Sequence, residues 1–596
     1  MEGMGRFLSG FICLGFFLIL LHGQACGAPP NVVVFLADDQ GWGDLSHHGN
    51  TNLRTPRMDS LAREGAELDN FFVCPVCSPT RAELLTGRYH ARGGVRDVSL
   101  GGERLNLNER TIADFFRAAG YRTGLFGKWH NGTQWPYHPL ARGFEEFYGF
   151  TSGHWGTYWD APMDHNGKTV KGKGYMTDDL TTHAIRFIGE KAIAKSPFFC
   201  MVSFNTPHSP MQVPDAYWKR FEKKELVQKG SKFEDPQFTR AALAMVENID
   251  DNVGRVLDSI KSHGLEKDTI VVYFSDNGPS SDRFSGPWKG RKGSLDEGGI
   301  RSPCFVRYPA KIKPGKHIGP IAGAIDLLPT LAQWCDVPLP GANPLDGESL
   351  VRLLEQDSPQ GKPRVLYTHW AGKVSARTDT YRMDPAGNLF DMIKDPGQTK
   401  NLSGELPNRA RTIGNSLENW KKEVGLPLPV DDRPFTVGYR EMPTTTLPAR
   451  DGRPKGGVIR SAPAPNDSFF TNWTKKTDAI TWDVRIATQG QYEAVLHMTQ
   501  KKVDAGARVE LSLGDKKCEV VLDQPHDPPL MGMENDRYPR RAGESYVKDF
   551  VAVPLGSLAL EKGRGILQLR ALDIPGTGVA DVKALELKLL LPKSPQ

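Results

Sequence analysis

An alternation of short apolar runs with longer amphipathic stretches extends over residues 31–335 and limits the possible fold most strongly. Residues 32–36 form one such apolar run, and residues 55–64 have a helical pattern. Strands that alternate with helices in this way are typical of βαβ units, in which the strands are parallel and helices cover the sheet. The sequence therefore predicts an α/β fold with a large mixed, mainly parallel sheet flanked by helices.

Length and composition exclude several classes of protein. The 596 residues suit several domains, and a hydrophobic content of 39% is that of a globular chain. A net charge of +5 is too small for a protein that neutralises many phosphates, so nucleic acid is not an expected partner. Eight cysteines are too few for a disulfide scaffold, so each cysteine must be judged by its surroundings.

The N-terminal residues resemble an export signal. Arg6 precedes the apolar stretch 11–21, and small residues surround Cys26. We expect residues 1–27 to be a signal peptide and the protein to be exported, either periplasmic or secreted. A membrane anchor is the alternative, although the stretch is shorter than a spanning helix needs and no later segment is long enough to span. Lipoprotein attachment through Cys26 is a minor alternative.

Composition divides the rest of the chain into four parts. A catalytic α/β domain is expected over 28–344 and a smaller α+β subdomain over 345–426. Residues 427–465 contain eight prolines in 39 positions and are expected to form an extended connector. Period-two alternation beyond it predicts a separate antiparallel β-sandwich over 466–596, and the alternation on either side of Gly490 predicts a hairpin.

Two predicted strands end in metal-binding side chains. The run 32–37 is followed by Asp38 and Asp39, and the run 270–275 by Asp276 and Asn277. Ligands of open α/β sheets bind at the carboxyl ends of the strands, so these four side chains are expected to meet. Their hard oxygen atoms suit Ca²⁺, with Mg²⁺ the less favoured choice. The alternative for either pair alone is a capping or turn role.

Two further runs end in basic side chains. Residues 123–126 lead to Lys128 and His130, and residues 198–204 lead to His208. Lys292 belongs to a separate basic cluster with its neighbours. The lysines could bind an anion and the histidines could transfer protons. Each residue alone could equally be a solvated loop charge or a structural hydrogen-bond donor.

Cys77 is predicted to lie at the N-terminus of a helix. Pro79 suits a first helical turn, and Thr86 with Gly87 suits its end. The free N–H groups there favour an anion, and Arg81 follows one turn later on the same face. A redox pair with Cys74 and two buried structural thiols remain as alternatives.

The segment Cys77-Ser78-Pro79-Thr80-Arg81, with Thr86-Gly87 at the matching distance, resembles the signature of the formylglycine-dependent sulfatases, arylsulfatase-like members of the alkaline phosphatase superfamily. The resemblance covers about residues 31–425. Further matching segments occur in order at 38–41, 87–89, 127–130, 206–208, 275–278, 292–294, 297–299 and 388–402.

The resemblance implies a mechanism. Cys77 would be oxidised to formylglycine by a maturation enzyme, and the hydrate of that aldehyde would be the nucleophile. Asp38, Asp39, Asp276, Asn277 and an oxygen of residue 77 would hold the cation. Arg81 would hold the hydrate, Lys128 and Lys292 would bind sulfate, His208 would protonate the departing alcohol, and His130 would be the base that releases sulfate.

The resemblance thus implies an exported sulfatase. Export, the aromatic loop 154–159 and the additional sandwich point to a sulfated carbohydrate as substrate. A phosphonate or phosphodiester hydrolase of the same superfamily is one alternative, and a non-catalytic carbohydrate-binding protein on the same scaffold is another. Trp473 and Trp482 could form a sugar platform, although the alternating position of Trp482 favours the sandwich core.

Overall fold

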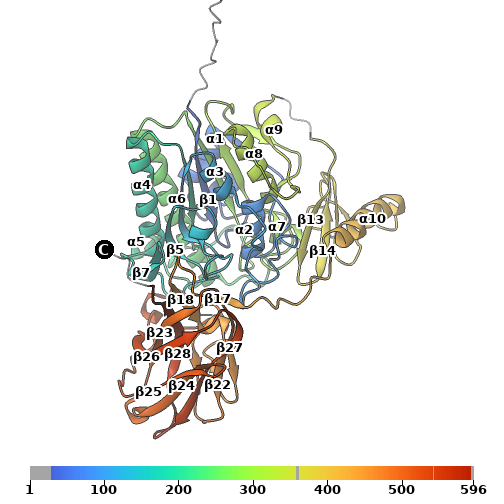
Figure 1. Cartoon of the computed structure of the whole chain (residues 1–596). Coiled ribbons are helices and arrows are strands. Elements are labelled where there is room, and N and C mark those ends of the chain that lie inside the picture. Colours follow the sequence, from blue (N-terminus) through green and yellow to red (C-terminus); the bar gives the residue numbers. More distant parts are fainter. Residues whose placement is uncertain (1–27, 358–360, 541–542, 592–596) are drawn as a thin grey trace, which may run out of the picture.

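The structure is a computed structural model that describes residues 28–357, 361–540 and 543–591. The predicted signal peptide, including Cys26, lies outside these residues. An α/β body and a β-sandwich lie one below the other in Figure 1. Within the described ranges, no helix combines the length and the apolar character that a membrane crossing requires.

A ten-stranded sheet forms the centre of the α/β body. Its order is β11-β2-β10-β9-β1-β8-β4-β5-β6-β7, and the five strands from β9 to β5 run parallel, whereas antiparallel pairs occur toward both edges. The predicted mixed, mainly parallel sheet is confirmed. The strands are β1 (Asn31–Ala37), β2 (Ala66–Leu68), β4 (Arg122–Lys128), β5 (Glu146–Phe150), β6 (Pro162–His165), β7 (Lys168–Lys171), β8 (Phe198–Ser203), β9 (Thr269–Ser275), β10 (Cys304–Arg307) and β11 (Lys316–Ile318).

Helices cover both faces of this sheet because its central strands are apolar on both faces. Val33 and Phe35 of β1 pack into one core, and Val32 and Val34 pack into the other. The first core is covered by α1 (Pro56–Glu64), α4 (Met176–Ile193), α5 (Asp215–Phe221) and α6 (Pro236–Ser262). The second is covered by α2 (Cys77–Thr86), α3 (Ile112–Ala118), α8 (Leu327–Trp334) and α9 (Val351–Glu355).

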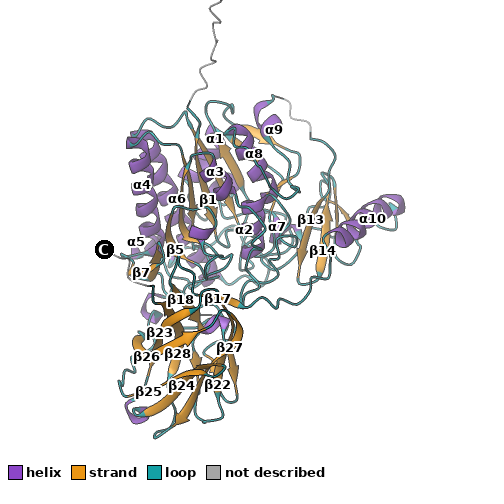
Figure 2. Cartoon of the chain, viewed as in Figure 1, coloured by secondary structure: helices purple, strands orange, loops and turns teal. Residues whose placement is uncertain are grey.

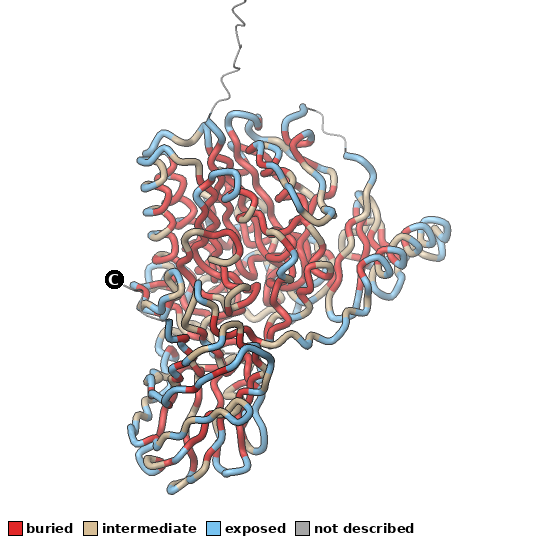
Figure 3. The backbone as a smooth tube through the Cα atoms, viewed as in Figure 1, coloured by how far each residue is buried: buried red, intermediate tan, exposed pale blue. Residues whose placement is uncertain are grey.

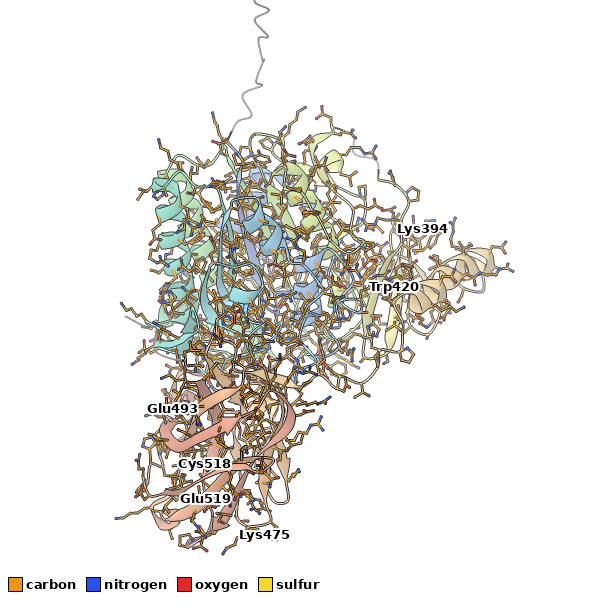
Figure 4. All side chains as sticks on the ribbon, viewed as in Figure 1. Lys394, Trp420, Lys475, Glu493, Cys518 and Glu519 are labelled. Atoms are coloured by element: carbon orange, nitrogen blue, oxygen red, sulfur yellow. The ribbon has the colours of Figure 1, made fainter. Side chains whose placement is uncertain are left out.

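A smaller α+β unit follows, as the sequence predicts. Its four antiparallel strands are covered by a helix that carries Trp420 (Figure 4). The ring of Trp420 stacks on that of Tyr367, with ring centroids 5.0 Å apart. Trp420 also contacts the ring edge of Tyr89, which joins this unit to the α/β body. Its elements are β13 (Leu366–Trp370), β14 (Lys373–Arg377), β15 (Tyr381–Met383), β16 (Leu389–Asp391) and α10 (Pro407–Glu423). The α/β body also contains the short helix α7 (Glu297–Ile300) and a two-stranded sheet of β3 (Phe71–Phe72) and β12 (Ala322–Gly323).

The C-terminal part is a sandwich of two sheets (Figure 2). One sheet has the order β17-β22-β27-β24-β25 with β19 beside β22, and the other has the order β20-β21-β28-β23-β26 with β18 beside β28. Its core is separate from those of the α/β body. The strands are β17 (Phe435–Val437), β18 (Thr444–Pro448), β19 (Arg453–Lys455), β20 (Ile459–Arg460), β21 (Phe470–Thr471), β22 (Ala479–Ile486), β23 (Gly490–Thr499), β24 (Ala507–Leu513), β25 (Lys516–Leu522), β26 (Val551–Leu560), β27 (Gly563–Asp573) and β28 (Asp581–Leu589).

The hairpin predicted around Gly490 is wrong. β22 pairs with β27, β17 and β19, whereas β23 pairs with β26 and β28 in the opposite sheet. The alternation of apolar residues shows which face of each strand is buried, and it is the same whether the chain turns back or crosses to the other sheet.

The proline-rich segment 427–465 differs from the expected connector. It contains β17 to β20, and each of these strands pairs with a strand of the sandwich. Prolines are compatible with this because Pro454 lies in the edge strand β19 and Pro448 ends β18. β17 and β18 lie where the sandwich meets the α/β body (Figure 1).

Trp473 and Trp482 do not form a sugar platform. Both side chains are buried in the sandwich core, and Nε1 of Trp482 donates to the carbonyl of Pro448. The alternation around Trp482 predicts that this residue lies in the sandwich core, and this prediction is confirmed.

Candidate active site

The candidate site lies at the carboxyl ends of the central strands. β1 and β9 are parallel neighbours with Ala37 opposite Ser275, so Asp38 and Asp276 follow side by side. β4 ends at Lys128, and the loop after β8 carries His208. The structure thus brings together all the site residues predicted from the four strand ends.

Four oxygen-bearing side chains converge where a cation is predicted. Asp38, Asp39, Asp276 and Asn277 are each no more than 1% exposed, and ligand atoms of Asp38, Asp276 and Cys77 lie within 4.8 Å of one another. Oδ1 of Asp38 and Oδ1 of Asn277 are buried without a hydrogen-bond partner. Unsatisfied buried oxygens are costly, and a hard divalent cation would satisfy both. The donor set therefore fits Ca²⁺ or Mg²⁺.

Two lysine side chains partly neutralise the carboxylates. Nζ of Lys128 lies 2.7 Å from Oδ2 of Asp38, and Nζ of Lys292 lies 2.5 Å from Oδ1 of Asp39. Burial alone would raise the pKa of Asp39, but the charge of Lys292 holds that pKa well below its usual range. The same pairing turns both lysine ammonium groups toward the centre of the site, where an anion would also contact them.

Asp276 is shared between the predicted cation and Arg81. Nη2 of Arg81 lies 2.8 Å from Oδ2 of Asp276, and Nη1 donates to the carbonyl of Lys128 and to Oγ of Ser203. Burial and the neighbouring Asp38 raise the pKa of Asp276 to about 6, although Arg81 opposes that shift. Added positive charge would keep this carboxyl ionised at neutral pH.

Cys77 begins helix α2, as predicted, and Gly87 ends that helix with φ 66°. Every residue of α2 is buried, in the red interior of Figure 3. Burial raises the pKa of the Cys77 thiol more than Lys128 and Lys292 lower it. Cys77 as a cysteine is therefore a neutral thiol and a poor nucleophile. Cys74 and Cys77 are both free cysteines, so the structure holds no disulfide between them.

His130 has one ring nitrogen that carries a proton and one that is free to accept a proton. Its backbone has φ 64°, and Nε2 lies 2.8 Å from the carbonyl of Val98. Because a carbonyl only accepts, Nε2 carries the proton and Nδ1 carries the lone pair. Nδ1 is buried without a partner. Burial and Lys128 hold the pKa of His130 well below its ordinary value, so the ring is neutral and can accept a proton.

His208 has the opposite arrangement. Nδ1 donates to the carbonyl of Ser209 at 2.7 Å, and Nε2 points into the site 3.9 Å from Oδ2 of Asp39. Burial and Lys292 lower the pKa of His208 to about 3. Its donor form is therefore the imidazolium, which an anion bound between the lysines would favour.

Sequence reasoning missed residues that complete the site from other elements. His154 stacks on His208 with ring centroids 5.6 Å apart, and Asn466 of the sandwich reaches the loop that carries Val98. Ser203 anchors Arg81. The aromatic loop 154–159 gave a weak signal for His154. Asn466 gave none, because its neighbours in space are hundreds of positions away in sequence.

Family models and curated relatives match the α/β body and the smaller α+β unit of this chain. The family model Sulfatase matches residues 30–337, and a model described as N-sulphoglucosamine sulphohydrolase, C-terminal, matches residues 291–422. The N-acetylgalactosamine-6-sulfatase of Mus musculus is 29% identical, over 58% of this chain and 70% of its own length. Arylsulfatase A of Homo sapiens is 29% identical, over 67% of this chain and 89% of its own length.

Solved structures give the same result for the fold. Ps i-CgsB, solved with k-i-k-neocarrahexaose, has a TM-score of 0.61 and 26% identity, over 67% of this chain and 98% of its own. A phosphonate monoester hydrolase of Agrobacterium radiobacter has a TM-score of 0.51 at 20% identity, which shows a shared fold alone. Both family models end before the sandwich.

Proposed function

Because this chain belongs to the sulfatase family and is a sulfuric ester hydrolase, we propose that it cleaves a sulfate ester of a sulfated carbohydrate with residue 77 in the formylglycine form. One observation supports this most directly. Cys77 lies buried at the start of α2 among Asp38, Lys128 and Lys292, and its thiol is held neutral. This position suits a nucleophile, but a protonated thiol is a poor nucleophile.

Maturation of Cys77 needs a partner enzyme. Converting the thiol to an aldehyde is a two-electron oxidation in which the carbon gains oxygen and the sulfur leaves as sulfide, so the formylglycine-generating enzyme must bring the electron acceptor. Hydration of the aldehyde gives two hydroxyl groups on one carbon. One hydroxyl attacks sulfur, and the other permits release of sulfate by C–O cleavage.

The cation is proposed to be Ca²⁺, with Mg²⁺ less favoured. Asp38, Asp39, Asp276 and Asn277 would hold it, and the two unpartnered buried oxygens support this assignment. When bound, such a cation lowers the pKa of a coordinated hydroxyl and offsets the charge of the carboxylates.

The remaining side chains divide the other tasks. Lys128 and Lys292 hold the sulfate oxygens and offset the charge that develops on them. His208 gives the proton on Nε2 to the oxygen of the departing alcohol as the S–O bond breaks. His130 then takes the proton of the remaining hydroxyl at Nδ1, and sulfate leaves as the aldehyde re-forms. Arg81, fixed by Asp276 and Ser203, holds the hydroxyl-bearing residue in place.

The carbohydrate substrate is proposed from the relatives and from the mouth of the site. One relative is named N-acetylgalactosamine-6-sulfatase, and one similar structure was solved in complex with k-i-k-neocarrahexaose. In this chain, the loop 154–159 brings His154 beside His208 and Trp155 against Phe150. Aromatic and polar side chains together are typical of sugar sites.

Mass analysis of the peptide spanning Cys77, followed by sulfate release from defined sulfated oligosaccharides, tests this proposal. We expect the mass of the aldehyde and release of inorganic sulfate. Cys77→Ala should remove activity while the fold is retained. Cys74→Ala is the matched control, because Cys74 is also a buried free cysteine but lies three residues before the reacting residue. An active enzyme with unmodified Cys77 would contradict the mechanism.

The same assay distinguishes the alternatives. Matched phosphate diesters and phosphonates, tested beside the sulfate esters, would reveal a phosphoryl preference. A mature protein that binds sulfated glycans but hydrolyses none would be a binding protein. Export is also proposed, from residues 1–27 alone, and N-terminal sequencing of protein from the extracytoplasmic fraction tests it. Recovery of uncleaved protein in the cytoplasm would contradict export.

A further inference from the structure

We infer that Asn466, a residue of the C-terminal sandwich, is a positioning residue for the base His130, so that the sandwich completes the active site of the α/β body. The inference rests on the proposed role of His130. It concerns a part of the chain that both family models leave unmatched.

Asn466 and His130 share one hydrogen-bond acceptor. Nε2 of His130 donates to the carbonyl of Val98 at 2.8 Å, and Nδ2 of Asn466 donates to the same oxygen at 3.4 Å. Oδ1 of Asn466 accepts from Oγ of Ser152 at 3.3 Å. The side-chain amide therefore ties the Val98 carbonyl to the segment that carries Ser152.

Gly153 shows how closely these groups pack. A Cβ atom at Gly153 would lie 2.4 Å from Nδ2 of Asn466 and 2.7 Å from Nε2 of His130. Both distances are too short for a real Cβ, so the imidazole and the amide enclose the backbone of Gly153 from two sides. Asn466 is 9% exposed and His130 is 1% exposed.

The sandwich also holds the chain directly after His130. Nη2 of Arg450 donates to Oγ1 of Thr133 at 2.7 Å, and Nε2 of Gln134 donates to Oδ2 of Asp451 at 3.0 Å. One residue later, the carbonyl of Trp135 accepts from Oγ1 of Thr436 at 2.5 Å. Three successive residues shortly after His130 thus contact the sandwich. These contacts fix the position of the sandwich relative to His130.

The consequence for the reaction concerns the tautomer of His130. As long as the Val98 carbonyl faces Nε2, the proton stays there and Nδ1 remains free to accept another. The amide of Asn466 holds that carbonyl and adds no charge. A carboxylate in its place would bring a negative charge close to the ring, would favour the imidazolium and would raise the pKa of the base.

The test compares Asn466→Asp and Asn466→Ala in the full-length mature enzyme. Asn472→Asp is the matched control, because the side chain of Asn472 also donates to a backbone carbonyl, that of Gly457, but within the sandwich. We expect Asn466→Asp to move the acidic limb of the kcat profile upward by about one pH unit or more. KM should change less than about twofold.

Asn466→Ala should lower kcat at an unchanged KM, without moving the acidic limb, at a temperature where the folded fraction equals that of the wild type. If Asn466→Asp does not fold, the kcat of Asn466→Ala alone tests the positioning role of Asn466. A pH profile and kcat equal to those of Asn472→Asp would overturn the inference, and so would a loss of activity that only follows a loss of folded protein. Absence of sulfate release by the mature wild type would instead overturn the proposed function.

Discussion

Arg81 and Asp276 form an ion pair that is buried almost completely, with Nη2 2.8 Å from Oδ2. It joins the helix that begins at Cys77 to the strand end that carries the proposed cation ligands Asp276 and Asn277. Removing one partner of such a pair leaves an uncompensated buried charge. We expect Arg81→Met to lower the free energy of unfolding by about 3 to 5 kcal/mol in urea titrations and to abolish sulfate release.

The control is Arg57→Met, because Arg57 is only partly buried and pairs with the exposed Asp258. An exposed pair contributes about 0 to 1 kcal/mol. Equal losses of stability in the two variants would contradict the structural role assigned to Arg81.

Removal of divalent cations should inactivate the enzyme without unfolding it. The carboxylates of the site are already paired with Lys128, Lys292 and Arg81, so the fold does not depend on the cation alone. Dialysis against a chelator should abolish sulfate release, and Ca²⁺ should restore it. At a Ca²⁺ concentration about 100 times Kd, linkage adds about 2.7 kcal/mol to the free energy of unfolding, which a thermal scan would record as a higher Tm.

Asn277→Ala sharpens this test. Oδ1 of Asn277 is one of the two unpartnered oxygens, so its loss should weaken Ca²⁺ binding about tenfold or more in a titration of the chelated protein. Asn408→Ala, on the exposed face of α10, should bind as the wild type does. Activity that survives complete chelation would exclude the cation from the mechanism.

Most of the site could be predicted because its residues directly follow apolar strands. The period of the sequence predicts the strands, and parallel strands place their carboxyl ends at one edge of the sheet, where Asp38 and Asp276 were expected. Their direct adjacency follows from the pairing of β1 with β9, which the structure shows. No such rule reaches Asn466, whose contacts depend on how two domains pack. The pairing of strands in the sandwich could not be predicted either. The alternation of β22 and β23 shows which face of each strand is buried but not which sheet the strand joins.

Trp482→Ala tests the structural role of that residue in the sandwich. Its side chain is fully buried and donates to the carbonyl of Pro448, so we expect the sandwich to lose about 3 to 5 kcal/mol of stability. The folded variant should bind sulfated oligosaccharides as the wild type does at low temperature. Val521→Ala, at an exposed position of β25, is the control and should change stability by less than about 0.5 kcal/mol. Weaker oligosaccharide binding by folded Trp482→Ala would revive the sugar platform.

Glu83 should make the stability of the protein depend on pH. This residue of α2 is buried and accepts from the backbone N–H of His90 at 3.2 Å, and burial raises its pKa from 4.5 to about 8. Below pH 4.5 the carboxyl is protonated in both the folded and the unfolded chain. Between 4.5 and 8 only the unfolded chain releases the proton, so the free energy of unfolding falls as pH rises, by up to about 1.4 kcal/mol per unit. Above pH 8 the carboxyl is ionised in the folded chain as well. Glu83 then no longer makes the free energy of unfolding depend on pH.

Glu83→Gln keeps the shape of the side chain and removes the titration. Urea unfolding at pH 5.5, 6.5 and 7.5 should therefore show a smaller decline for Glu83→Gln than for the wild type. Glu418→Gln, at an exposed position of α10, should follow the wild type. Parallel curves for Glu83→Gln and the wild type would mean that Glu83 is already ionised in the folded protein and would contradict the raised pKa.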